Sequence, residues 1–399
     1  MTVPVGYLIT VALAAGPTLL ALMPLRRPPI LAALTFRLTL AINELPFIGC
    51  YYLVAATVLV IGQHDVTSPG GWAALGLGGL VMAGLGVTAR RGLRAGPAVQ
   101  AARAEAFGER GTRPADSARA ATVARRLPLG RILFQPFFAR SFSVQKVTNI
   151  SYGDAGRRNR LDLYRHRGQP VNAPVLIHLH GGHFVHGGKS RQAMPLLYRL
   201  ASQGWVCISA NYRLSPGATF PDFLVDVKKV LAWVRENGSR YGADPATVFV
   251  AGSSAGAHLA AMAALTPNDP DFQPGFEDAE TSVTAAITLG GYYGPLDSDG
   301  RLPSSPMACI HPDAPPFFIA HGSNDTVVGV EMARELARKL RAVSANPVVY
   351  AELPGGQHAF DLFHSLRFDA ISNGIEAFAG LVRTRASQAR PDPSSCAGR

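Results

Sequence analysis

The sequence predicts an α/β fold, a mostly parallel sheet with helices on both faces, preceded by an N-terminal transmembrane helical region. After about residue 144, short apolar β-branched runs alternate with longer helical patterns. The short runs are hydrophobic throughout rather than alternating, as strands covered on both faces are. The first 89 residues contain three long apolar segments with almost no internal charge.

Seven short runs are expected to be strands, and they are residues 161–164, 175–180, 206–211, 248–251, 285–289, 317–320 and 348–353. Five stretches among them are expected to be helices, near residues 193–202, 223–237, 255–264, 330–342 and 367–384. Ligands of such sheets bind at the carboxyl ends of the strands. The residues that directly follow a strand are therefore the candidates for a functional site.

The strand run at 248–251 leads into a Gly-x-Ser-x-Gly sequence centred on Ser254, followed by an alanine-rich helical pattern. A strand, a tight turn and a helix in this order form a nucleophile elbow, whose flanking residues must be small. Ser254 would stand at a helix N-terminus, with the amide of Ala255 facing a developing oxyanion. Because the chain has 41 glycines, this motif alone can arise by chance.

A glycine turn, His-Gly-Gly-His at residues 180–183, follows the second predicted strand. Its glycines let backbone amides turn toward a substrate oxygen. A glycine turn after a strand is common by itself, but here it precedes a Gly-x-Ser-x-Gly in an α/β chain. We therefore expect an oxyanion hole formed by Gly181, Gly182, His183 and Ala255.

Two polar residues complete a possible catalytic set. Asp325 follows the sixth predicted strand and His358 follows the seventh. Each alone has a simpler explanation, as a helix cap or a loop histidine. Together the order Ser254, Asp325, His358, each after its own strand, is that of the α/β-hydrolases and predicts a Ser-His-Asp triad. The nearest competitors, Asp361 and His364, lie in the expected start of the next helix.

The motifs of the second half are HGGH at 180–183, NYRLSP at 211–216, FP at 220–221 with Asp226, YGADP at 241–245, GSSAGAHLA at 252–260, HGSNDTVV at 321–328 and GGQHAF at 355–360. With these motifs, residues 151–383 resemble the α/β-hydrolase esterases of the hormone-sensitive-lipase-like group. Within this group, the chain resembles membrane-anchored mycobacterial Lip-type esterases. The resemblance implies a serine carboxylic-ester hydrolase that forms an acyl-enzyme and needs neither a metal nor another cofactor.

Two positions depart from the pattern of that family. His183 stands where a third glycine is usual, and its Cβ restricts φ there. Gly217 stands where an acid is usual. With both changes, the sequence resembles those family members that are similar to prenylcysteine methylesterases and formamidases. The substrate class therefore stays open. The resemblance also implies a structural role, in packing and ion pairing near the site, for Tyr212, Arg213, Asp222 and Asp226.

The N-terminal region is expected to be integral to a membrane. Its apolar segments, residues 3–25, 45–62 and 70–89, are each about long enough to cross a bilayer. Buried helices of a soluble domain are the alternative, and three nearly uncharged runs argue against it. The first segment lacks a basic leader and a convincing cleavage site, so a cleaved signal peptide fits poorly.

The arginines beside these segments predict the orientation. Arg26, Arg27 and Arg37 lie between the first and second segments, and residues 63–71 contain no Lys or Arg. Further arginines, beginning with Arg90, follow the third segment. The positive-inside rule then predicts an outside N-terminus and a cytoplasmic catalytic domain at the plasma membrane.

Much of the net charge of +11 comes from residues 90–150, which hold twelve Lys or Arg against three Asp or Glu. This stretch lacks interleaved aromatics and any nucleic-acid motif, so an anionic membrane surface is the expected partner rather than nucleic acid. Three phenylalanines within 132–138 could belong to a lid at residues 132–142 or pack ordinarily. The four scattered cysteines imply no disulfide. The expected domains are a membrane region at 1–89, a basic juxtamembrane linker at 90–143, a catalytic domain at 144–385 and a disordered tail at 386–399.

The sequence therefore predicts a membrane-anchored serine esterase or lipase that acts on a small-molecule or lipid ester. An amidase, a formamidase or a prenylcysteine-methylesterase-like hydrolase would use the same triad. A catalytically silent receptor on the same fold is less favoured, because all three triad positions are filled. The acyl chain, the preference for esters over amides and the oligomeric state stay open.

Overall fold

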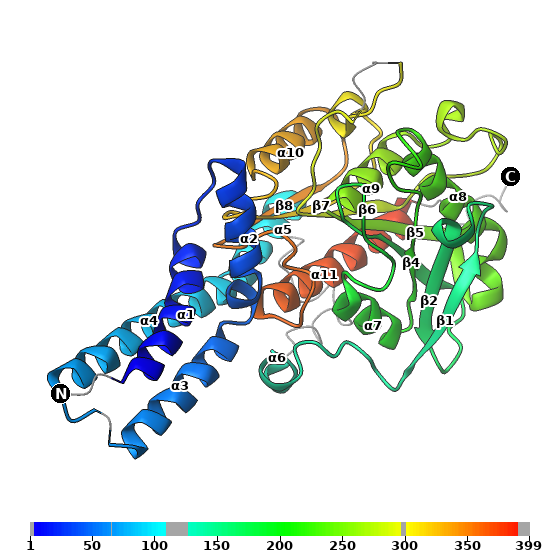
Figure 1. Ribbon diagram of the computed structural model, residues 1–399. Coiled ribbons are helices and arrows are strands. Elements are labelled where there is room, and N and C mark those ends of the chain that lie inside the picture. Colours follow the sequence, from blue (N-terminus) through cyan, green and yellow to red (C-terminus); the bar gives the residue numbers. More distant parts are fainter. Residues whose placement is uncertain (1–3, 65, 109–126, 297–300, 390–399) are drawn as a thin grey trace, which may run out of the picture.

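The computed structural model describes residues 4–64, 66–108, 127–296 and 301–389, and it places N-terminal helices beside an α/β domain (Figure 1). The strands are β1 (Val144–Ser151), β2 (Arg160–His166), β3 (Ala173–Leu179), β4 (Val206–Ala210), β5 (Ala243–Ser253), β6 (Ala285–Leu289), β7 (Phe317–Gly322) and β8 (Val348–Leu353). They form one sheet in the order β1-β2-β4-β3-β5-β6-β7-β8. Pairing is parallel from β4 to β8, whereas β2 pairs antiparallel with both β1 and β4.

Helices cover both faces of this sheet, which confirms the predicted fold class. The helices of the α/β domain are α7 (Met194–Ser202), α8 (Asp222–Asn237), α9 (Ala255–Leu265), α10 (Glu331–Val343) and α11 (Leu366–Ala389). Helices α8, α9 and α10 share one hydrophobic cluster with one face of the strands, and α7 and α11 share a second with the other face. Along β5, Val248 and Val250 belong to the first cluster and Phe249 to the second, as the period of two in a strand requires.

Helix α5 (Ala95–Phe107) lies in the stretch expected to be a linker, yet it is a packed layer of the α/β domain. Ala95, Val99 and Ala102 are buried at helical spacing in the cluster that also contains α11 and β8. The ring of Phe107 packs edge-on against that of Phe378, with centroids 6.2 Å apart. Residues 109–126 of the expected linker lie outside the described residues.

Three N-terminal helices pack side by side into a bundle, α1 (Val5–Leu22), α3 (Pro46–Gly62) and α4 (Pro69–Leu93) (Figure 1). Small residues allow the close approach, because a Cβ on Gly84 would lie 2.8 Å from Cγ2 of Thr18. Two stretches are long and apolar enough to cross a membrane. They are helix α1 and the helix Pro69–Phe107, which consists of α4 followed directly by α5.

Helix α2 (Pro29–Glu44) occupies a stretch in which no helix was predicted. A proline at its first turn favours the helix, but Arg37 interrupts the apolar pattern that identified the other segments. The axes of α2 and α3 are bent by 80° from each other, and this pair would be a third span if both helices counted as one. In Figure 1, α2 lies between the bundle and the α/β domain.

The possible lid segment packs against residues that come directly before the last helix. The short helix α6 (Leu129–Phe134) precedes Phe137. The ring of Phe137 packs edge-on against the ring of Phe363, with centroids 5.4 Å apart. The amide of His364 donates to the carbonyl of Pro136 at 2.9 Å. Helix α11 continues to Ala389, four residues into the stretch expected to be a tail, and residues 390–399 lie outside the described residues.

Candidate active site

Ser254 connects β5 to α9 in a strained turn, with φ 54° and ψ −118°. A left-handed φ at a residue other than glycine costs energy, and such strain is typical of functional sites. The surroundings enforce the turn. A Cβ on Gly252 would lie 2.0 Å from the carbonyl oxygen of Gly256, and one on Gly256 would lie 2.1 Å from that of Leu179. Both flanking positions therefore require glycine.

The structure brings Ser254, His358 and Asp325 into one hydrogen-bonded line. The Oγ of Ser254 lies 3.0 Å from Nε2 of His358, whose Nδ1 lies 2.7 Å from Oδ2 of Asp325. The other carboxylate oxygen of Asp325 accepts the amides of Val327 and Val328, each at 2.8 Å. A hydroxyl, a base within its reach and a fixed carboxylate behind the base are the parts of an activated nucleophile.

Electrostatics favours an ionised carboxylate and a strengthened base. Burial alone would raise the pKa of Asp325, but the charge of His358 and hydrogen bonds from His321 and His358 hold it below its usual range. Burial alone would lower the pKa of His358, and the neighbouring Asp325 raises it above the ordinary imidazole value. His321, whose Nε2 lies 3.2 Å from Oδ2 of Asp325, was not among the predicted site residues.

The four residues expected to form the oxyanion hole differ in whether their backbone amides already donate a hydrogen bond. The amide of Gly181 donates to the side-chain oxygen of Gln192, so it is already engaged. Within the described residues, no acceptor is found for the amides of Gly182, His183 and Ala255. Gly182 and His183 both have positive φ, at 128° and 54°, which turns the backbone sharply after the strand. His183 thus adopts a glycine-like conformation despite its Cβ.

Tyr212 holds the strand end that carries this turn. Its hydroxyl donates to the carbonyl of His180 at 2.7 Å, and the two rings stack with centroids 4.4 Å apart. Burial lowers the pKa of His180 to about 4, so the imidazole is neutral at physiological pH. Its Nδ1 lies 2.8 Å from the carbonyl of Gly181 and donates to it.

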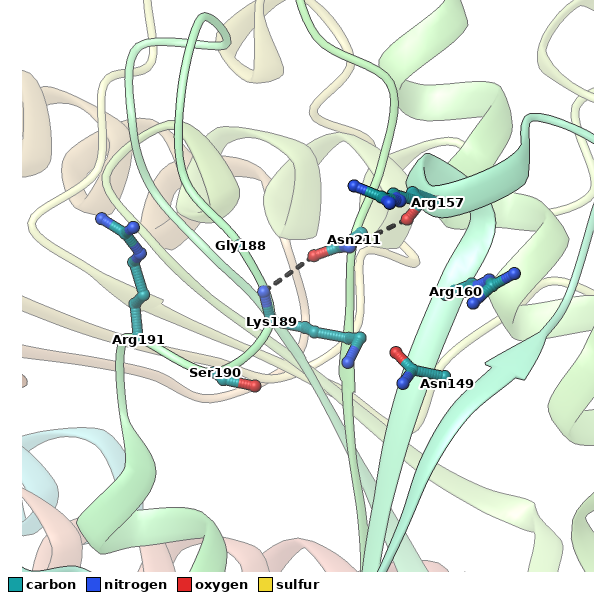
Figure 2. Close-up of a pocket in the computed structure, with 8 residues that line it drawn as sticks. All are labelled: Asn149, Arg157, Arg160, Gly188, Lys189, Ser190, Arg191 and Asn211. Atoms are coloured by element: carbon teal, nitrogen blue, oxygen red, sulfur yellow. Dashed lines mark hydrogen bonds between the residues drawn. The ribbon is translucent and has the colours of Figure 1, made fainter.

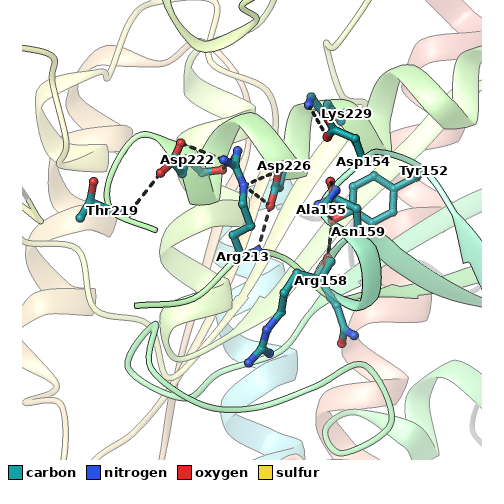
Figure 3. A network of polar contacts seen from close by, with 11 residues as sticks. Tyr152, Asp154, Ala155, Arg158, Asn159, Arg213, Thr219, Asp222, Asp226 and Lys229 are labelled. Carbon is teal, nitrogen blue, oxygen red and sulfur yellow. Dashed lines mark hydrogen bonds and ion pairs between the residues drawn. The ribbon is translucent and has the colours of Figure 1, made fainter. Parts of the chain in front are cut away.

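Arg213, the next residue, anchors the same segment to α8 (Figure 3). Its backbone amide donates to Asp226 at 2.8 Å, and its Nε lies 3.0 Å from the same carboxylate. Its Nη1 donates to Asp222 at 3.1 Å. Asp226 is fully buried, so this ion pair compensates for its desolvation. These contacts are the packing and pairing that the family resemblance implied for the segment.

The two competing residues, Asp361 and His364, contact other groups than Ser254. Asp361 accepts the hydroxyl of Ser253, whose Oγ also lies 3.0 Å from Nε2 of His178. This buried line joins the elbow, strand β3 and the loop that carries the histidine of the site. No sequence motif signalled it, because each residue lies in a different part of the chain.

Further along the same edge of the sheet lies an open pocket of about 360 Å³ (Figure 2). It is lined by Asn149, Arg157, Arg160, Gly188, Lys189, Ser190, Arg191 and Asn211. The amide of Lys189 donates to Oδ1 of Asn211 at 2.8 Å, which fixes the loop after the glycine turn. The ammonium of Lys189 pairs with the buried Asp162. The remaining charges of the lining are positive.

Helix α2 reaches the site from the N-terminal region, a contact that the sequence does not predict. The ring of Phe36 packs edge-on against that of His358, with centroids 5.8 Å apart. The carbonyl of Ala32 accepts the hydroxyl of Thr326 at 3.0 Å, one residue after Asp325. An apolar pattern signals membrane or core alike, so it could not reveal which residues such a helix touches.

A buried ion pair fixes the end of α2 to the α/β domain. Arg367 pairs with Glu44, and both side chains are only 1% exposed. Ser365 donates to the same carboxylate at 2.8 Å, and Arg367 also donates to the carbonyl of Pro354 at 3.3 Å. A glutamate at the edge of an apolar segment was the available sequence signal, and it pointed to no partner.

The parallel sheet, the elbow after β5 and the order of the hydrogen-bonded residues define an α/β-hydrolase. Comparisons with known proteins narrow this class. A family model described as BD-FAE matches residues 161–300. The probable carboxylic ester hydrolase LipM of Mycobacterium tuberculosis is 44% identical over 274 residues, which cover 62% of this chain and 64% of LipM.

Esterase LipQ of the same organism is 39% identical over 67% of this chain and 70% of its own length. The apo form of Thermogutta terrifontis esterase 2 shares the fold, with a TM-score of 0.52 and 23% identity over 63% of this chain and 98% of that one. The chain belongs to the hormone-sensitive-lipase-like family of α/β-hydrolase carboxylesterases, which confirms the resemblance. It spans slightly less than two thirds of the length of LipM.

Proposed function

We propose that this protein is a membrane-anchored serine carboxylic-ester hydrolase that acts through Ser254, His358 and Asp325. The observation that carries the proposal is the hydrogen-bonded line from Ser254 Oγ through His358 to Asp325 at a strained elbow. The names of LipM and LipQ, both ester hydrolases, support the ester as the bond that is broken.

In this mechanism, Nε2 of His358 accepts the proton of Ser254 as Oγ attacks the ester carbonyl. Asp325 holds the proton of Nδ1, which fixes the tautomer and stabilises the imidazolium that forms. His358 then donates its proton to the leaving alcohol, and an acyl-enzyme remains on Ser254. Water, activated by the same histidine, releases the acid and restores the hydroxyl.

The developing oxyanion would accept hydrogen bonds from the amides of Gly182, His183 and Ala255. Such a donor typically contributes about 3 kcal/mol in the transition state, because it is oriented before the charge appears. The engaged amide of Gly181 has a different role, since its bond to Gln192 fixes the turn that presents the next two amides.

The membrane part of the proposal rests on the apolar helices and on the arginines beside them. Helix α1 and the helix Pro69–Phe107 have the length and composition of spans. The arginines at 26, 27, 37, 90 and 91 then favour a cytoplasmic α/β domain at the plasma membrane. A lipid-like ester supplied from the bilayer is the substrate that fits this attachment.

Membranes carrying the wild-type protein should hydrolyse p-nitrophenyl esters between acetate and palmitate, and Ser254→Ala should abolish this activity. Ser387→Ala is the matched control, because Ser387 is an exposed serine on α11. A fluorophosphonate should label the wild type and the control, and leave Ser254→Ala unlabelled. Equal rates for folded wild type and Ser254→Ala would contradict the proposal. Faster turnover of matched p-nitroanilides would make the protein an amidase instead.

A further inference from the structure

The inner face of α2 is fixed to the catalytic residues. Its buried positions, Ala32, Thr35, Thr39 and Asn43, recur at helical spacing and lie on one side of the helix. This side includes the hydrogen bond from Thr326 and ends at the Glu44–Arg367 pair. Helix α2 therefore has a defined orientation relative to His358.

The outer face of α2 is apolar, and none of the residues that the structure describes covers it. Ile30, Leu31, Leu34 and Leu38 are 76%, 36%, 48% and 44% exposed, and their spacing places them on one side of the helix. A contiguous exposed patch of large aliphatic side chains marks a contact surface. Arg37, also exposed, lies at the edge of this face, as basic residues do in helices that lie in a membrane interface.

The direction of the α2 axis indicates what the apolar outer face contacts. Helix α3 packs with α1 and α4 in the bundle proposed to cross the bilayer. Since α2 is bent by 80° from α3, it runs nearly parallel to the membrane surface when the bundle stands across it. Its two ends continue into α1 and α3 within a few residues, so its depth is limited to the boundary of the bilayer.

We infer that α2 lies in the membrane interface and forms one wall of the entrance to the active site. The substrate is then an amphiphilic ester that is taken from the lipid leaflet on the side of the α/β domain. This inference rests on the proposed function and specifies its substrate class. Phe36, half-buried and in contact with His358, is the residue of α2 that places this wall beside the catalytic base.

The test uses the full-length protein in phospholipid vesicles with two substrates, water-soluble p-nitrophenyl acetate and bilayer-dissolved p-nitrophenyl palmitate. The double variant Leu34→Gln/Leu38→Gln makes the outer face polar. We expect the ratio of palmitate to acetate turnover to fall about tenfold, because the face loses its apolar burial in lipid. Val343→Gln on α10 is the control, since Val343 is 45% exposed and belongs to the α/β domain; its ratio should equal that of the wild type.

A second measurement does not depend on turnover. It is made in a Trp72→Phe background, because Trp72 is an exposed tryptophan of α4 that lipid would also quench. In this background, the fluorescence added by Leu34→Trp should be quenched by brominated phospholipids, whereas the fluorescence added by Val343→Trp should not. An unchanged substrate ratio, or no quenching at position 34, would overturn the inference. If the wild type hydrolyses neither ester while position 34 is quenched, the proposed function has failed and the interfacial position of α2 stands.

Discussion

Glu44 at the end of α2 and Arg367 at the start of α11 form a buried ion pair between residues more than 320 positions apart. Breaking such a pair on one side leaves an uncompensated charge, which typically costs about 3–5 kcal/mol. We expect Glu44→Gln to lower the free energy of unfolding by this amount, measured by thermal unfolding in detergent micelles.

The double variant Glu44→Gln/Arg367→Met should be more stable than Glu44→Gln alone, since it leaves no unpaired charge in the interior. Glu335→Gln is the control, because it removes a partner from the exposed pair with Arg338. It should leave the unfolding transition unchanged. Equal stability of wild type and Glu44→Gln would show that the two side chains do not pair.

The pH dependence of kcat/KM should reveal His358. The base acts only when it is neutral, so activity is lost as the pH falls through its pKa. Because Asp325 raises this pKa, the acid limb of the wild type lies above the ordinary imidazole value. Asp325→Asn should move the limb to lower pH and reduce kcat by about four orders of magnitude, as misoriented imidazoles do. An acid limb at the same pH in both proteins would assign it to another group.

Ser253→Ala should destabilise the elbow without removing a triad residue. The substitution leaves the buried carboxyl of Asp361 without its hydroxyl donor, which typically costs about 1–3 kcal/mol. It also removes the contact between Ser253 and His178. Stability and the rate of p-nitrophenyl acetate hydrolysis are measured together, with Ser387→Ala as control. If the stability and the hydrolysis rate of Ser253→Ala both equal those of the wild type, the contacts of Ser253 with Asp361 and His178 do not stabilise the elbow.

The orientation of the membrane region is testable with reporters fused to the C-terminus. A reporter active only in the cytoplasm should be active, and one active only outside the cell should not, because the arginines near α1 and α4 favour the cytoplasmic side. The opposite pattern would place the α/β domain outside and contradict the proposed location.

The fold class was predictable because the hydrophobic periodicity and the sequence motifs of the α/β domain indicate the same arrangement of strands and helices. Each of the seven predicted strands overlaps an observed one, and the glycines at 252 and 256 mark a turn that the structure shows to have no room for a Cβ. Strand β1 was missed because it is an edge strand with alternating burial and polar residues. Helix α5 was not predicted as a core element because, apart from Phe107, its buried residues are only alanines and a valine, in an arginine-rich stretch.

The contacts around the candidate site were less predictable, since they depend on tertiary neighbours. Nothing near Gln192 in the sequence indicates that its side chain accepts the amide of Gly181. This hydrogen bond is what distinguishes the engaged amide of Gly181 from the free amide of Gly182 among the described residues. Likewise, the composition of residues 29–44 does not reveal that Phe36 touches His358. Such pairings are set by how distant segments meet, which a periodic pattern does not encode.

Helices α4 and α5 follow each other with only Arg94 between them, and they lead from the bundle into the core of the α/β domain, where Val99 and Ala102 are buried. The 39 residues of Pro69–Phe107 correspond to about 58 Å at the rise of an α-helix. If the bundle crosses the bilayer as proposed, this connection would hold Ser254 at a constant height above the lipid. The protein would then search for its substrate in two dimensions, so its rate would follow the mole fraction of ester in the bilayer rather than the concentration in the surrounding water.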